Sequence, residues 1–186
     1  SGNGEYVWVL DPIDGTRSFI TGKPVFTTLI ALLHNEIPVL GLIDQPVLKE
    51  RWIGATERST TLNNALANTR NCPSLDKASM YTTGTEWYGP KELKTLDNLR
   101  LNTMMTLFST DAYAFGLLAS GHIDIAIECQ MEPHDFLALI PIVGGSGGII
   151  TNWEGEPLKS DSKSNILAAG DPAIHEKVLK ILAKNQ

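Results

Sequence analysis

Two aspartates three residues apart follow an apolar segment near the start of the 186-residue chain. Asp11 and Asp14 stand in the run Asp-Pro-Ile-Asp-Gly-Thr, directly after the Tyr-Val-Trp-Val-Leu segment at 6–10. Pro12 forces a turn here, so both carboxylates, together with the Ile13 carbonyl, can converge on a hard cation such as Mg²⁺, which prefers oxygen ligands. In the alternative interpretation, the carboxylates only accept hydrogen bonds from the backbone amides of an Asx-type turn. Both interpretations fit this motif taken alone.

Gly15 and Thr16 follow the second aspartate and suit the binding of a phosphate group. Because glycine has no side chain, Gly15 lets the backbone approach a ligand closely, and its amide with that of Thr16 can hold a phosphate oxygen. The Thr16 hydroxyl can in addition orient a water molecule. Lys23 could add a positive charge to such a site, and a solvated loop lysine is an equally good interpretation.

Two further acids, Glu128 and Asp135, lie in the second half of the chain. Glu128 is expected at the end of a short strand, and Asp135 at the start of a helix. An acid in that position often only caps the helix, which contributes about 0.5–2 kcal/mol. A glycine-rich run at 144–148 comes next, so acids from both ends of the chain stand beside tightly turning backbone. This arrangement favours a shared site over two unrelated caps.

The elements that must position these residues begin with strands and continue as a mixture of strands and helices. From β-branched and aromatic runs, strands are predicted at 6–10, 26–34, 37–43, 51–55, 123–127, 149–151 and 166–169. The first strand is expected to be buried and to stop at Asp11, and the first four to form an antiparallel meander. Residues 56–78 are predicted to be a polar loop containing one strand or turn.

Helical spacing predicts four helices, at 90–99, 110–120, 135–143 and 174–184. Gly121 is a suitable stop for the second helix, and Pro141 should kink or end the third because proline lacks an amide hydrogen. Strands first and mixed elements later predict an α+β fold passing into α/β. The expected subdomains are an antiparallel sheet with the aspartate motif at 1–56 and an α/β unit at 57–186.

The composition excludes several classes of function. The net charge is −6 and no basic tract is present, which disfavours binding to nucleic acid. No apolar run approaches the roughly 18–20 residues that a membrane-spanning helix needs, so no membrane partner is expected. Cys72 and Cys129 have no metal-ligand spacing and are too sparse for a disulfide framework, so a reducing, cytoplasmic compartment is expected. The four tryptophans are expected to pack in the core or under loops.

Over residues 7–169 the sequence resembles the inositol-monophosphatase superfamily. The resemblance rests on Asp-Pro-Ile-Asp-Gly-Thr after an apolar strand and on Asp135 followed by a Gly-Gly run. The second motif of that family usually reads Trp-Asp-x-Ala-Ala, with Glu-x-Gly-Gly further on. Here His134 replaces the tryptophan and Gly144 the glutamate. His134 could face the substrate, support Asp135 or lie on the surface.

The resemblance implies a layered αβαβα sandwich and a phosphatase that uses two or three Mg²⁺ ions and is usually a homodimer. Its metal ligands would be Asp11, the Ile13 carbonyl, Asp14 and Asp135. Its phosphate-binding residues would be Gly15 and Thr16. Asp14 and Thr16 would be catalytic, with Thr16 positioning the water that attacks phosphorus, and Glu128 would contact the alcohol part of the substrate.

Within the superfamily, the sequence is most similar to the histidinol-phosphatase branch, on the stretches 17–24, 111–121, 133–143 and 151–155. Histidinol carries an ammonium and an imidazole, whereas inositol is a neutral polyol. Asp111 and Glu128 could pair with a cationic amine by charge-assisted hydrogen bonds. Asp111 could also cap the helix predicted at 110–120, and the two roles are compatible. The substrate-binding residues are therefore predicted to be Ser109, Thr110, Asp111, Glu128 and Asp135.

The predicted reaction is the hydrolysis of histidinol phosphate to histidinol and phosphate, a step of histidine biosynthesis. One alternative is a sibling specificity, for inositol phosphate or a related sugar or nucleotide phosphate. The other is a catalytically inactive remnant that serves as a binding module.

The beginning of the chain leads to a further expectation. Residues 1–4 include no initiator methionine. Family members carry an acidic metal ligand, a water-activating acid and two helices ahead of the first aspartate motif. The chain is therefore expected to be a C-terminal piece of a longer protein, with weak metal binding and little turnover by itself.

Overall fold

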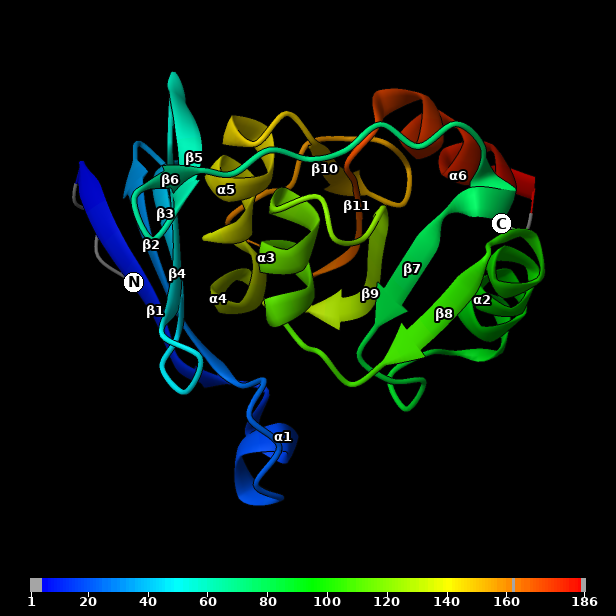
Figure 1. Cartoon of the computed structure of the whole chain (residues 1–186), viewed down its shortest axis with the longest axis horizontal. Helices are drawn as coiled ribbons and strands as arrows, with labels where there is room; N and C mark the ends of the chain where they lie inside the picture. Colours follow the sequence, from blue (N-terminus) through cyan, green and yellow to red (C-terminus); the bar gives the residue numbers. More distant parts are fainter. Residues whose placement is uncertain (1–4, 162, 185–186) are drawn as a thin grey trace.

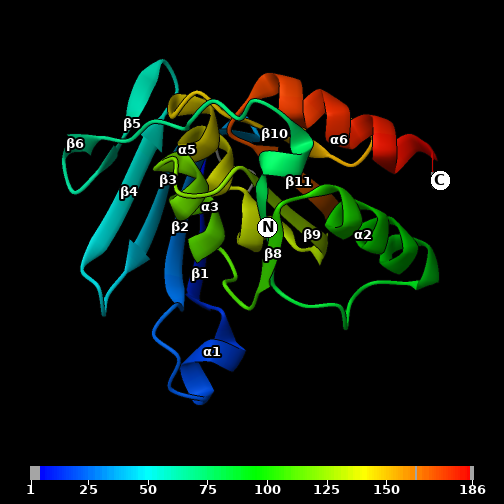
Figure 2. The same ribbon diagram turned by 45° about the vertical axis from the view of Figure 1, so that its right-hand side comes forward.

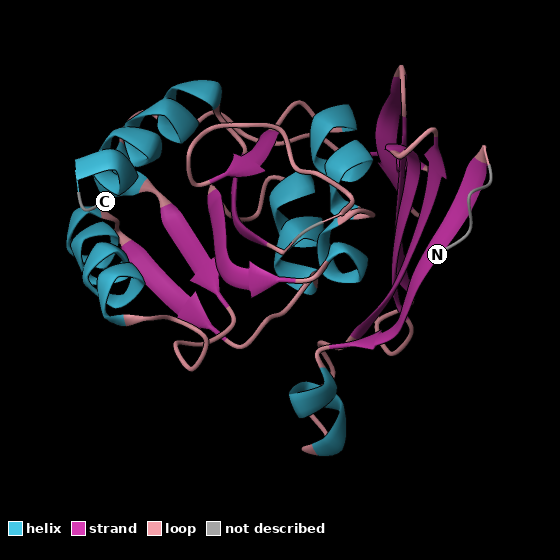
Figure 3. Cartoon of the chain, turned by 180° about the vertical axis from the view of Figure 1, so that it is seen from behind, coloured by secondary structure: helices cyan, strands magenta, loops and turns pink. Residues whose placement is uncertain are grey.

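The structure is a computed structural model that describes residues 5–161 and 163–184. Residues 1–4, on which the expectation of a longer protein was based, lie outside these ranges. Figure 1 shows four successive layers: a six-stranded sheet, a pair of central helices, a five-stranded sheet, and two outer helices. The central pair is α3 (Tyr113–Ala119) and α5 (Leu139–Gly145), and the outer pair is α2 (Pro90–Asn102) and α6 (Pro172–Lys184). Figure 3 shows the same central helices from behind, between the two sheets.

The first sheet is a continuous antiparallel meander in which each strand pairs with the next. Its strands are β1 (Tyr6–Asp14), β2 (Thr27–His34), β3 (Ile37–Gln45), β4 (Glu50–Ala55), β5 (Arg58–Leu62) and β6 (Ala65–Leu66). Asn35 and Glu36 both have positive φ, as do Asn63 and Asn64. Two such residues in succession make the tight turns that join twisted antiparallel strands. The predicted meander of four strands is confirmed. It continues through β5 and β6, which lie in the segment 56–78 that was predicted to be a polar loop containing one strand or turn. Both added strands lie beyond residue 56, where the predicted first subdomain ends.

Strand β1 does not stop at Asp11, as predicted, but runs on to Asp14 with a register shift between these two aspartates. Pro12 is tolerated because β1 is an edge strand, where a missing amide hydrogen costs no ladder bond. The prediction that this strand is buried is also wrong for one of its faces, since Tyr6, Trp8 and Leu10 are more than half exposed. No helix from the described parts of the chain covers that outer face (Figure 1).

The second sheet is mixed, in the order β10-β11-β9-β7-β8. Its strands are β7 (Ser79–Thr82), β8 (Met105–Phe108), β9 (Ile125–Met131), β10 (Ile149–Asn152) and β11 (Ser164–Ala169). Strand β7 pairs parallel with both β8 and β9, and α2 forms the crossover between β7 and β8. Neither β7 nor β8 was predicted, because four residues without clear alternation give too weak a signal.

Three short helical elements complete the described chain: α1 (Thr16–Ile20), the 3₁₀ turn η1 (Leu75–Lys77) and α4 (Pro133–Phe136). The helix predicted at 135–143 is divided into α4 and α5, with a break at Leu137 and Ala138. Pro141 explains the break, since it has no amide hydrogen to donate to the Leu137 carbonyl four residues earlier. The helix predicted to begin at Thr110 begins instead at Tyr113, because Asp111 has a positive φ of 48°.

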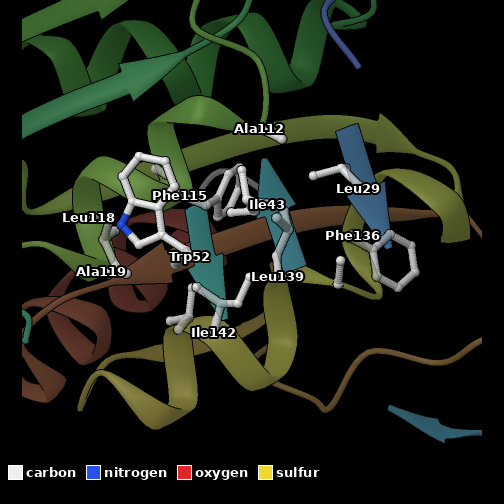
Figure 4. Packing of buried hydrophobic residues seen from close by; sticks show 14 of the residues in the cluster. Leu29, Ile43, Trp52, Ala112, Phe115, Leu118, Ala119, Phe136, Leu139 and Ile142 are labelled. Carbon is white, nitrogen blue, oxygen red and sulfur yellow. The ribbon is translucent and has the colours of Figure 1, made fainter. Parts of the chain in front are cut away.

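Two hydrophobic cores hold the layers together. The larger core lies around the central helices, and Figure 4 shows Trp52, Phe115 and Ile142 among its side chains. The indole amine of Trp52 donates a hydrogen bond of 2.8 Å to the hydroxyl of Ser120. The smaller core lies between the second sheet and the outer helices, which Figure 2 shows side by side at the C-terminal end of the molecule. Within residues 5–161 and 163–184, no helix has the length and apolar character to cross a membrane.

Candidate active site

A cavity of about 580 Å³ lies where the end of β1, the start of α1, the start of α3, β9 and α4 meet. Its lining includes every residue predicted for the site except Ser109 and Thr110. These elements come from the first and the second half of the sequence and from both sheets, so only the folded chain brings the predicted residues together.

The aspartate motif forms the turn that its sequence predicts and still presents free oxygens. The Ile13 amide donates to Asp11 Oδ1 at 3.1 Å, so Asp11 does accept an Asx-type hydrogen bond. The Thr16 hydroxyl donates to the Ile13 carbonyl oxygen, also at 3.1 Å. A carboxylate has capacity for about four such interactions, so the turn and a metal-ligand role are compatible at Asp11.

Asp14 is the most constrained acid of the motif. Its Oδ2 accepts hydrogen bonds from the Ala112 amide at 2.7 Å and from the Thr27 hydroxyl at 3.3 Å. Burial, together with the charges of Asp111, Asp11 and Asp135, raises the pKa of Asp14 to about 8 against the lowering effect of the Ala112 hydrogen bond. A carboxylate with this surplus of negative neighbours is favoured in its ionised form when a cation is close.

Asp135 combines a capping role with a place in the cavity. Its Oδ2 accepts a 2.8 Å hydrogen bond from the Glu132 amide and so forms a capping box at the start of α4. Burial raises the pKa of Asp135, with the charges of Asp11 and Glu132 acting in the same direction. The capping interpretation from the sequence is therefore correct, and it occupies only one of the two carboxylate oxygens.

Asp11, His134 and Asp135 each place a potential ligand atom within 4.8 Å of the other two. His134 Nε2 lies 3.3 Å from Asp135 Oδ1. Two carboxylates and an imidazole are common ligands of divalent cations. The donor set present in the cavity therefore fits the metal that the sequence predicts.

Position 15 requires glycine, both for its backbone conformation and for the atoms that surround it. Its φ is +77°, and a Cβ atom placed on it would lie 2.8 Å from Asp111 Oδ2. The same Asp111 oxygen accepts a hydrogen bond of 3.1 Å from the Ser18 hydroxyl, and burial raises the pKa of Asp111. Asp111, the predicted substrate residue, is thus held by Ser18 of α1 against the turn that is predicted to bind phosphate.

Glu128 lies in the middle of β9, not at the end of a strand as predicted, and it pairs with Ile166 of β11. Its Oε1 accepts hydrogen bonds from the Thr83 amide at 2.6 Å and the Thr83 hydroxyl at 2.8 Å. Burial raises the pKa of Glu128 to about 8, and the negative charges of Asp111 and Asp14 contribute. Glu128 therefore faces the same cavity as the aspartates and shares their surplus of negative charge.

Ser109, Thr110 and Lys23 do not line the cavity. The Lys23 ammonium donates to the Ser109 carbonyl oxygen at 2.5 Å. Thr110 is buried, and its hydroxyl has no hydrogen-bond partner among the described residues. The structure therefore does not bring these three residues into the cavity with Asp111.

The rim of the cavity contains residues that the sequence analysis missed. Arg17 Nη1 lies 2.9 Å from Glu86 Oε1, and its guanidinium carbon lies 5.2 Å from the centre of the Trp87 ring. Trp87 is 58% exposed and Trp8 is 59% exposed, which corrects the expectation that the four tryptophans pack in the core or under loops. On another side, Lys163 Nζ lies 2.6 Å from Glu132 Oε1. Arg17 follows the aspartate motif directly and could have been suspected, whereas no sequence signal marks Trp87 or Lys163.

Comparisons with known proteins identify relatives of the chain. A model of the inositol monophosphatase family matches residues 1–186. The protein named bifunctional phosphatase IMPL2, chloroplastic, from Arabidopsis thaliana is 49% identical over 97% of this chain and 54% of its own length. A histidinol-phosphatase from Streptomyces coelicolor is 30% identical over 98% of this chain and 71% of its own length. The chain thus spans about half the length of the plant relative.

Solved structures share the fold closely. An inositol monophosphatase from Zymomonas mobilis has a TM-score of 0.95 at 42% identity, over 98% of this chain and 72% of that one. A second, from Anabaena, has a TM-score of 0.90 at 26% identity, over 99% of this chain and 74% of that one. These structures confirm the predicted layered sandwich. The match to the family model confirms the predicted superfamily. The chain therefore belongs to the inositol monophosphatase family.

Proposed function

We propose that the protein containing this chain hydrolyses the phosphate monoester of a small metabolite with Mg²⁺ as its cofactor. The observation that carries the proposal is the convergence of Asp11, Asp14 and Asp135 on one cavity, from an edge strand and from a helix far apart in the sequence. Family membership supports the same reaction. The number of ions is proposed to be two or three.

The residues of this chain have separate tasks in that reaction. Asp11, the Ile13 carbonyl, Asp14 and Asp135 would hold the cations. Bound there, a divalent cation neutralises phosphate charge and lowers the pKa of the attacking water. The positive φ of Gly15 lets the backbone amides approach a phosphate oxygen without a side chain in the way.

Thr16 is proposed to orient the attacking water. Its hydroxyl donates its hydrogen to the Ile13 carbonyl oxygen at 3.1 Å, which leaves the hydroxyl oxygen able to accept a hydrogen bond from water. A water held in this way keeps a lone pair directed toward the phosphorus, and its position depends on the geometry of the turn. No side chain of the protein needs to be phosphorylated.

For the substrate, we propose histidinol phosphate. Asp111 and Glu128 both line the cavity, and burial raises the pKa of each carboxyl group. A cationic amine placed between them would offset the free-energy cost of burying the two ionised carboxylates and would form charge-assisted hydrogen bonds with them. The name of the Streptomyces relative supports this substrate.

A second candidate, inositol phosphate or a related sugar phosphate, is favoured by the Zymomonas structure, which is described as an inositol monophosphatase. The third candidate is an inactive binding module.

The test is release of phosphate by the full-length protein from histidinol phosphate, inositol phosphate, fructose bisphosphate and a nucleotide 3′-phosphate, with and without Mg²⁺. Histidinol phosphate is expected to rank first. A low rank for histidinol phosphate would reject the substrate and leave the reaction intact. Absence of Mg²⁺-dependent release from every substrate would reject the reaction, and binding of Mg²⁺ with phosphate without turnover would favour the binding module.

The assembly and the compartment are proposed separately. We expect a homodimer, which light scattering coupled to size-exclusion chromatography would measure. The cytoplasm stays the predicted compartment, while the Arabidopsis relative is chloroplastic by name. Fractionation of cells that express the tagged full-length protein would distinguish the two.

A further inference from the structure

His134 differs from the other residues near the predicted metal ligands because it offers a nitrogen. It is the second residue of α4, directly before Asp135, and its side chain is half exposed and lines the cavity. The sequence motif that the family shares usually has tryptophan here, which has no lone pair to offer a cation. His134 therefore adds a nitrogen donor to a cavity in which the predicted metal ligands are oxygen atoms.

The spacing of the donor atoms suits one ion. His134 Nε2 lies 3.3 Å from Asp135 Oδ1, and Asp11 completes a group whose members all lie within 4.8 Å. Around an octahedral cation with bonds of about 2.1 Å, neighbouring ligands lie about 3 Å apart and opposite ligands about 4.2 Å apart. The separations in the structure, 3.3 Å for one pair and at most 4.8 Å for the others, are close to those of such a ligand set.

A simple ion pair between His134 and Asp135 is the competing explanation. Such a pair at a half-exposed position contributes little, and it does not account for the position of Asp11 beside both. Asp11 and Asp135 are both acids, so they repel one another without a cation between them.

We propose that His134 Nε2 is a direct ligand, with Asp11 and Asp135, of one divalent cation, and that it shifts the preference of this position from Mg²⁺ toward Mn²⁺. Imidazole nitrogen suits transition metals, whereas Mg²⁺ takes oxygen ligands. The inference rests on the proposed metal-dependent function and specifies one ligand of its site.

The direct test is electron spin-echo envelope modulation of Mn²⁺ bound to the full-length protein. Modulation from ¹⁴N is expected in the natural protein and should be lost in His134→Gln, while His122→Gln, changed at an exposed position outside the cavity, should keep it. Calorimetric titration should show about 10-fold weaker Mn²⁺ binding in His134→Gln and less than about 2-fold weaker Mg²⁺ binding.

The possible results separate the inference from the function on which it rests. Bound Mn²⁺ without ¹⁴N modulation in the natural protein would overturn the role of His134 and leave the metal site standing. Equal losses of Mn²⁺ and Mg²⁺ affinity in His134→Gln would also overturn the role of His134 as a ligand and would favour a simple ion pair with Asp135. Failure of the natural protein to bind either cation, with or without phosphate, would overturn the proposed function itself.

Discussion

Asp14 and Ala112 lie 98 residues apart in the sequence, and the Ala112 amide donates a 2.7 Å hydrogen bond to Asp14 Oδ2. This bond ties the end of the edge strand β1 to the start of the central helix α3. It also engages Oδ2 of Asp14, and a carboxylate has further capacity to accept a ligand. The same contact therefore joins the two halves of the fold and sets the orientation of a predicted metal ligand.

The pH dependence of stability follows from the two most buried acids of the cavity. Burial raises the pKa values of Asp14 and Glu128 to about 8, from ordinary values of 3.8 and 4.5. Between about pH 4 and pH 8 the folded protein therefore binds more protons than the unfolded protein, so its free energy of unfolding falls as the pH rises through this window. With a chelator present, the melting temperature should be several degrees lower at pH 8 than at pH 6, and Mg²⁺ should reverse the loss.

Two variants serve as controls for that titration. Asp14→Asn and Glu128→Gln each remove one titrating group while keeping its shape, so each should flatten the dependence on pH. A profile that is already flat for the chelated natural protein would contradict the raised pKa values.

Asp14→Asn should also remove catalysis in the full-length protein. The amide keeps an oxygen for the Ala112 bond but loses the charge that a cation needs, so kcat should fall by several orders of magnitude, about 10³-fold or more, as when a strong electrostatic contribution is removed. Phosphate release measured at saturating Mg²⁺ checks this. A rate near that of the natural protein would be incompatible with Asp14 as a metal ligand.

Asp111→Asn tests recognition of the amine. The asparagine oxygen can still accept the bond from the Ser18 hydroxyl, so the loop should keep its position. The loss of one charge-assisted hydrogen bond, about 1.5–3 kcal/mol, should raise KM for histidinol phosphate about 10-fold or more. KM for inositol phosphate should change by less than about 2-fold, and a parallel rise for both substrates would assign Asp111 a purely structural role.

Gly15→Ala and Gly22→Ala form a matched pair that isolates the contact with Asp111. Both glycines have nearly the same positive φ, +77° and +76°, but a Cβ on Gly15 would lie 2.8 Å from Asp111 Oδ2, whereas one on Gly22 would meet nothing within 4 Å. Each substitution should cost about 1–2 kcal/mol of stability through backbone strain. Only Gly15→Ala should in addition lower phosphate release by more than about 10-fold; equal activities for the two variants would show that the strain alone matters.

The turn of the aspartate motif could be predicted from the sequence because its signals are local. Asp11, Asp14, Gly15 and Thr16 lie within six residues, and their chemistry does not depend on distant neighbours. Pro141 was likewise expected to disturb its helix, and the break appears four residues earlier because the lost hydrogen bond belongs to the Leu137 carbonyl. In each case the cause lies within about one helical turn.

The parts that were missed depend on tertiary structure. Strands β7 and β8 are four residues long and pair in parallel through a helical crossover, so neither a hairpin turn nor alternation marks them. Trp87 belongs to the rim only because its loop lies beside Arg17, a residue 70 positions earlier. Position in the cavity is decided by such long-range neighbours, and composition or periodicity does not reveal them.

Gly144 and Gly145 offer a final pair of substitutions, on adjacent residues of the last turn of α5. A Cβ atom on Gly144 would meet nothing within 4 Å, whereas one on Gly145 would lie 2.7 Å from both the Arg58 carbonyl oxygen and Thr60 Oγ1. Thr60 Oγ1 already donates to the Ile142 carbonyl oxygen at 2.7 Å, so it has little freedom to move. Gly144→Ala should stabilise the protein by about 0.5–1 kcal/mol because alanine favours the helix, and Gly145→Ala should destabilise it by about 1–3 kcal/mol through overpacking. Urea denaturation followed by circular dichroism measures both, and effects of the same sign would contradict the close approach of α5 to β5.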